Sequence, residues 1–107
     1  MSRTNITIKS NIDIPLEKIE NFCRRWKIKE FALFGSVLRE DFSPDSDIDV
    51  LVTFEPDRGI SFDNRVDMLD ELIEIFGREV DLVEKNFIRN PFRRHEILKN
   101  KEVVYAA

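Results

Sequence analysis

Residues 35–49 read GSVLREDFSPDSDID, and they lie between two apolar runs, FALF at 31–34 and VLVTF at 50–54. Each flanking run is short and apolar, which is typical of a buried strand. Carboxylates at the border of a buried strand are costly unless they are paired or bind a ligand. The stretch therefore predicts two strands of one core, with a functional site where they are joined.

Length and composition limit the kinds of protein that this chain can be. Its 107 residues, 42% of them hydrophobic, suit a single domain over 1–107 with one core. The formal net charge of -4 gives no basic footprint, so we expect no direct nucleic-acid partner. No apolar run approaches the roughly 18 residues of a membrane span, and no signal peptide is recognisable. We therefore expect a cytoplasmic protein with no membrane partner.

The single cysteine, Cys23, excludes an intrachain disulfide and a zinc site built from several cysteines. A buried residue of a helix is the expected role of Cys23, because free cysteine behaves as a small apolar side chain.

The remaining elements follow from apolar spacing. Helices are predicted over 15–26, 61–77 and 91–99, and a brief helix over 36–40. Strands are predicted over 29–35, 47–54 and 78–85, with an edge strand over 102–107. The buried stripe of the second helix is expected to comprise Phe62, Val66, Leu69, Leu72, Ile73 and Phe76. This order predicts a small α/β (α+β) domain with helices covering its strands.

Three aspartates form the candidate site. Asp47 and Asp49 are two positions apart on a predicted strand, so their side chains point to the same side. Two such charges repel unless a cation lies between them, and carboxylate oxygens suit a hard ion such as Mg²⁺. Asp81 is on the face opposite Val80 and Leu82. If its strand pairs beside 47–54, three carboxylates could hold two metals about 4 Å apart.

The Gly35-Ser36 pair precedes this acidic pair by ten residues. Glycine lets a phosphate approach the backbone, Ser36 adds a hydroxyl, and a helix starting there adds free amides. Taken alone, however, a Gly-Ser pair is usually a turn, and two nearby aspartates are usually solvated. A calcium loop starting at Asp45 is the other metal-binding reading, but it fails because Val50 and Pro56 replace the required glycine and glutamate.

Gly35-Ser36, ten residues, then Asp47-Ile48-Asp49 resembles the signature of the DNA polymerase β-like nucleotidyltransferase superfamily. The string GSVLREDFSPDSDIDVLV is similar to the minimal nucleotidyltransferases, or MNT-domain proteins, and the likeness extends through REVDLV to the last predicted strand. The resemblance implies a small mixed β-sheet flanked by helices.

The resemblance also implies roles for single residues. Gly35 and Ser36 would hold a nucleoside triphosphate. Asp47 and Asp49 would bind metal, and Asp81 would be the third carboxylate, which helps to activate the attacking hydroxyl. Arg39 and Ser46 are further candidate nucleotide contacts, although Arg39 could equally be a surface or salt-bridging arginine. Leu38 and Glu40 depart from the common pattern, and neither departure removes a ligand.

MNT-domain proteins are commonly paired with HEPN-domain ribonuclease toxins. The resemblance therefore implies an adenylyltransferase antitoxin that uses Mg²⁺, with Mn²⁺ as the alternative, to transfer AMP from ATP to a tyrosine of the toxin. Two other functions stay open, a binding module that neutralises the toxin without catalysis and a nucleotidyltransferase acting on RNA or a small molecule. Arg89 and His95 have the spacing of HEPN ribonucleases themselves, but those domains are helical, and this chain has several strand-like runs.

Overall fold

A central β-sheet with helices on both sides organises the chain. The computed structural model describes residues 5–6, 14–38, 47–55 and 62–107. Its helices are α1 (Leu16–Trp26), α2 (Phe62–Phe76) and α3 (Pro91–Asn100), with 3₁₀ turns η1 (Gly35–Leu38) and η2 (Lys85–Phe87). Its strands are β1 (Asn5–Ile6), β2 (Ile14–Pro15), β3 (Ile28–Phe34), β4 (Ile48–Phe54), β5 (Val80–Glu84) and β6 (Glu102–Ala106). The predicted mixed α/β class is confirmed.

The main sheet has four strands in the order β5-β4-β3-β6. β3 runs antiparallel to both β4 and β6, whereas β4 and β5 are parallel, so the sheet is mixed. The return from β4 to a parallel β5 requires a crossover, and α2 supplies it. β1 and β2 form a separate two-stranded pair that the sequence did not predict.

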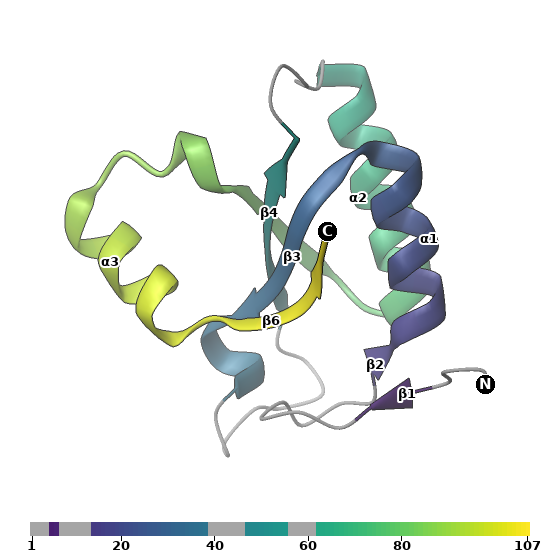
Figure 1. The fold of residues 1–107 in the computed structure, drawn as a ribbon, viewed down its shortest axis with the longest axis horizontal. Coiled ribbons are helices and arrows are strands. Elements are labelled where there is room, and N and C mark those ends of the chain that lie inside the picture. Colours follow the sequence, from purple (N-terminus) through teal and green to yellow (C-terminus); the bar gives the residue numbers. More distant parts are fainter. Residues whose placement is uncertain (1–4, 7–13, 39–46, 56–61) are drawn as a thin grey trace.

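Helices α1 and α2 pack together on one face of the sheet (Figure 1). On α1 the residues Ile19, Phe22 and Cys23 are fully buried, as their helical spacing predicts. The strands contribute alternate residues to this core, for example Val50 and Val52 of β4. The helical spacing on α1 and the alternation along the strands therefore produce one continuous apolar layer.

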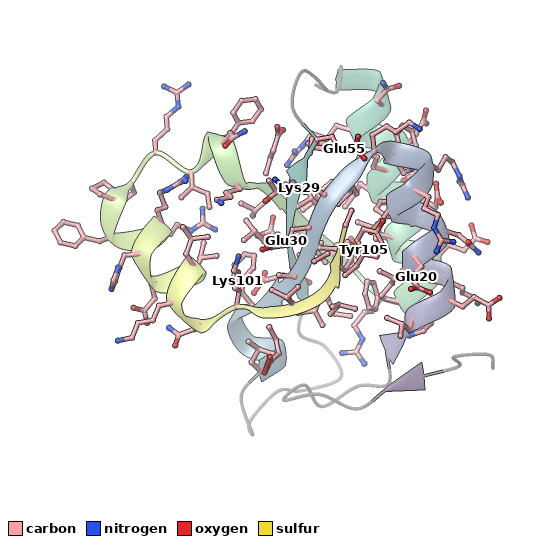
Figure 2. The ribbon with its side chains drawn as sticks, in the orientation of Figure 1. Glu20, Lys29, Glu30, Glu55, Lys101 and Tyr105 are labelled. Atoms are coloured by element: carbon pink, nitrogen blue, oxygen red, sulfur yellow. The ribbon has the colours of Figure 1, made fainter. Side chains whose placement is uncertain are left out.

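The opposite face of the sheet is covered by α3 (Figure 1). Its smaller core consists of Ala32, Phe34, Leu51, Ile88 and Ile97. Pro91 starts α3, and the side chain of Asn90 accepts hydrogen bonds from two backbone amides of the first turn. At the other end of α3, Lys101 forms an ion pair with Glu30 of β3, and Figure 2 shows the two side chains facing each other.

Two details differ from the predicted helices. Val66 is 43% exposed, so the predicted stripe was wrong at Val66. Among the side chains of α2 that the structure describes, Met68 and Leu72 are fully buried, and the side chain of Phe62 is not described. α2 is inclined on the sheet by its contacts with α1 and β5, which sequence periodicity cannot specify. Of the brief helix predicted over 36–40, residues 36–38 are in the 3₁₀ helix η1, and residues 39–40 lie outside the described part of the chain.

None of the helices that the structure describes is both long and apolar enough to cross a membrane. Cys23 lies in the α1 core as predicted. Burial, followed by the nearby charge of Glu20, raises the pKa of its thiol to about 12. The thiol is therefore not a nucleophile at neutral pH.

Candidate functional site

Gly35 is placed directly after β3 and adopts a left-handed backbone conformation with φ +76°. A Cβ atom at this position would lie 2.1 Å from Oδ2 of Asp49 and 3.1 Å from its Cγ. Glycine is therefore required on two counts, the backbone angle and the space taken by the Asp49 carboxylate. The sequence suggested that this glycine makes room for a phosphate, which stays a prediction; the structure shows that it makes room for Asp49.

The register of the sheet brings two of the predicted aspartates side by side. Asp49 is paired with Phe34 on the antiparallel strand β3 and with Asp81 on the parallel strand β5. Val80 and Leu82 are buried on the other face, as the alternation along 78–85 predicted. Asp49 and Asp81 therefore share the sheet face that carries α3, at the end where β3 stops and β4 and β5 begin.

Asp47 immediately precedes β4, and its side chain is exposed. The start of β4 is tied to β5 because the Ile48 amide donates to the Glu79 carbonyl at 3.0 Å. Asp49 is half-buried between the strands, while Asp81 is exposed. The three carboxylates thus lie along one end of the sheet.

The type and position of the carboxylates decide whether they could bind a metal ion. Within residues 5–6, 14–38, 47–55 and 62–107, no three His, Cys, Asp or Glu side chains are grouped closely enough to hold a metal. The chemistry of the donors nevertheless fits Mg²⁺, because all three candidate ligands are carboxylates. The fit rests on ligand type and strand register, and the three side chains do not converge on one point.

Several predicted nucleotide contacts fall outside the described residues. The backbone of Ser36 belongs to η1, but its side chain is not described, and Arg39 and Ser46 are in the undescribed stretch 39–46. Their assignment stays a prediction.

A groove lies beside Asp81, along the outer edge of β5. It has a volume of about 450 Å³, and it is named the β5 groove after its lining residues, Arg65, Asp81, Leu82, Val83, Glu84, Phe87, Ile88 and Arg93. Arg65 reaches across from α2 and donates a hydrogen bond to the carbonyl of Leu82. No motif in the sequence indicated this groove.

Glu84 is a buried carboxylate in this groove. It is 8% exposed, and its Oε2 atom has no hydrogen-bond partner among the described residues. Burial raises the pKa of Glu84, and the positive charge of Arg65 acts in the opposite direction. Its sequence signal was available, because Glu84 follows Val80 and Leu82 at the alternate positions that face the core.

The basic residues near the C-terminal end do not form a second catalytic site. Arg89 and His95 are both exposed, and His95 is on α3, as predicted. Arg94 donates to the carbonyl of Lys85 at 2.7 Å and so has a structural role. The four-stranded sheet excludes the all-helical HEPN ribonuclease reading.

Comparison with known proteins identifies the family of this chain. Residues 16–104 match the nucleotidyltransferase domain family. A relative from Methanocaldococcus jannaschii, assigned as a protein adenylyltransferase, is 37% identical over 92% of this chain and 97% of its own length. The protein adenylyltransferase MntA of Thermococcus cleftensis is 29% identical over 86% of this chain and 96% of its own length.

Solved structures show the same fold at lower identity. A toxin-antitoxin structure with AMP-PNP aligns with a TM-score of 0.70 at 20% identity, over 86% of this chain and 73% of the other. One chain from a structure of the tri-AMPylated HEPN toxin of Shewanella oneidensis in complex with an MNT antitoxin aligns with a TM-score of 0.62 at 19% identity, over 86% of this chain and 70% of the other.

Proposed function

The chain belongs to the nucleotidyltransferase domain family, and we propose that it transfers AMP from ATP to a tyrosine of a HEPN-domain toxin. The observation that carries the proposal is the position of Asp49. It is held against Gly35 on one side and beside Asp81 on the other, so the Gly-Ser turn and two of the acids form one site. The names of the relatives and the toxin complexes among similar structures support the same reaction.

Asp47, Asp49 and Asp81 are the residues that would hold Mg²⁺, with Mn²⁺ as the alternative. The ion would offset the charge of the triphosphate and of the transferred phosphoryl group. Gly35 and Ser36 at the start of η1 would hold the triphosphate, with Arg39 and Ser46 as further contacts. Asp49 is on a strand that is paired on both sides, so its backbone is held before ATP binds, and the three carboxylate side chains would turn onto the ion.

In the proposed reaction, the tyrosine oxygen forms a bond to the α-phosphorus of ATP. The bond between that phosphorus and the oxygen bridging to the β-phosphorus breaks, and pyrophosphate leaves. Asp81 accepts the phenol proton, because it is exposed and lines the β5 groove, from which an acceptor can approach. The products are tyrosyl-AMP on the partner and free pyrophosphate.

The partner supplies the acceptor in this proposal. A HEPN toxin is the partner class we propose, since structures with this fold include an antitoxin bound to such a toxin carrying AMP. The HEPN protein would therefore act as both binding partner and substrate.

The test is transfer of radiolabel from ATP, labelled at the α-phosphate, to a cognate HEPN protein in the presence of Mg²⁺. We expect wild type to label the partner and the double variant Asp47→Asn, Asp49→Asn to lose at least about 1,000-fold of that activity. The double variant Asp67→Asn, Asp70→Asn is the matched control. It removes the same charge from exposed positions on α2 and should label normally.

Partner binding by the same proteins distinguishes the alternative function. If wild type binds the HEPN protein tightly but transfers no label, the chain is a binding antitoxin and the proposed catalysis is wrong. Equal labelling by wild type and by the Asp47, Asp49 variant would contradict the assignment of the site.

A further inference from the structure

We propose that the β5 groove binds the acceptor segment of the partner protein, as an extended peptide that places its reactive hydroxyl beside Asp81. This inference rests on the proposed function, because it assigns the acceptor side of the same site. Its occupant is a tyrosine-bearing segment of the partner.

The outer edge of β5 is available for an extended peptide. β5 is the last strand in the sheet order, and in the part of the chain that the structure describes no other strand pairs with that edge. The Glu79 carbonyl bonds to β4, so the backbone groups of Val80, Leu82 and Glu84 point outward. The carbonyl of Leu82 accepts a hydrogen bond from Arg65, and the other outward groups along the edge can pair with an added strand.

The backbone of Glu84, and not its side chain, is what this position presents to a peptide. Its Oε2 is buried and has no hydrogen-bond partner among the described residues, so a ligand lying in the groove does not reach it. The amide and carbonyl of Glu84 belong to the outward row of β5, with which an added strand would pair.

The lining of the groove fits an aromatic acceptor. Apolar surface comes from Phe87, which is 67% exposed, and from the half-buried Val83. The volume of about 450 Å³ accommodates a phenol ring with part of its backbone, and Phe87 is the side chain against which that ring would pack. Arg65 and Arg93 line the groove together with Asp81 and Glu84, so charges of both signs surround its apolar part, which suits a polar peptide segment better than a purely apolar ligand.

Asp81 connects the groove to the catalytic end of the sheet. It lines the β5 groove and is also the strand partner of Asp49. A hydroxyl bound there is next to the carboxylate that would accept its proton, and Asp49 lies one strand away. The groove is therefore continuous with the proposed active site.

The test compares two exposed phenylalanines. Phe87→Ala removes the anchor of the groove, whereas Phe92→Ala removes a side chain that is 85% exposed on α3 and outside the groove lining. With a cognate HEPN protein as acceptor, we expect Phe87→Ala to raise the KM for the partner about tenfold, with the Kd for Mg²⁺-ATP unchanged. Phe92→Ala should leave that KM within about twofold of wild type.

The remaining outcomes distinguish failure of the groove proposal from failure of the proposed reaction. Labelling by wild type with equal KM values for the two variants would overturn the groove as the acceptor site while keeping the proposed function. No labelling by wild type would overturn both. A loss of self-association in Phe87→Ala, with the KM for the partner unchanged, would show that a second copy of this chain occupies the groove and would also overturn the proposal.

Discussion

Among the described residues, the face of the sheet under α1 and α2 belongs to a cluster of fourteen buried side chains, whereas the core on the α3 face comprises five. The first face is closed by two long helices, and its strand positions are apolar almost throughout. On the second face, α3 covers the middle of the sheet, and Asp49 and Asp81 occupy its end. The comparison indicates that one face supplies most of the stability while the other leaves room for charged groups and a substrate.

Glu84 is the exception to this division, and it is informative. It is on the closed face by strand alternation, yet it is a carboxylate and it lines the β5 groove. Burial disfavours the charged form of such a side chain and so raises the pKa of Glu84. The exception therefore occurs where the closed face meets the proposed partner surface.

The largest expected effect is loss of stability from the closed face. Phe22 is fully buried and stacks edge-on against Phe31 at 6.1 Å between ring centroids. We expect Phe22→Ala to lower the free energy of unfolding by about 3–5 kcal/mol, from lost burial and the cavity left behind. Urea denaturation measures this change, and Phe92→Ala, on an exposed site of the open face, should cost less than about 0.5 kcal/mol. Similar losses for the two variants would refute the comparison.

The next largest effect is on transfer activity at the α3 face of the sheet, the open face, and substitutions at two glycines measure it. Gly35 and Gly77 both have positive φ, +76° and +72°, so alanine strains the backbone at either position. Only at Gly35 would the new Cβ meet Asp49, because nothing lies within 4 Å of a Cβ at Gly77. We expect Gly35→Ala to lower transfer to the partner about 100-fold by displacing Asp49.

Gly77→Ala is the control for that prediction. It should destabilise the protein by about 1–2 kcal/mol, as Gly35→Ala should, but keep its activity. Thermal unfolding and the radiolabel assay on the same samples separate the two effects. If both variants lose activity equally, backbone strain rather than the position of Asp49 is responsible.

The smallest expected effect is a pH dependence that comes from Glu84. Burial raises the pKa of Glu84, so the folded protein keeps this proton at pH values where the unfolded chain has lost it. Its contribution to stability is therefore complete below the unfolded pKa and is lost as pH rises through the folded pKa. Glu84→Gln removes the ionisation, and we expect it to flatten the decline in stability that wild type shows as pH rises above the ordinary carboxyl pKa of 4.5.

Urea denaturation at several pH values measures this difference between wild type and Glu84→Gln. Glu55→Gln is a control with the same change of charge at an exposed position, and it should leave the pH dependence as in wild type. If the free energy of unfolding changes with pH in the same way for wild type and Glu84→Gln, burial does not raise the pKa of this carboxyl group.

Much of this architecture was predictable, because helices and strands each produce a local periodic pattern of apolar residues in the sequence. The helical spacing of Ile19, Phe22 and Cys23 and the alternation of Val80, Asp81 and Leu82 follow from the 3.6- and 2-residue periods, and the structure confirms both. The spacing of Gly35 and Asp49 was also readable as a motif. Each of these signals depends on neighbours in the chain, so the sequence by itself determined them.

Only the tertiary structure decided which distant residues meet. The parallel pairing that sets Asp81 beside Asp49, and the contact of Asp49 with Gly35, join residues far apart in the chain. The burial of Met68 in place of Val66, and the β5 groove with Glu84, depend on how α2 is seated on the sheet. Periodicity specifies which face of an element is apolar, but the packing of whole elements, summed over many weak contacts, selects the partner of that face.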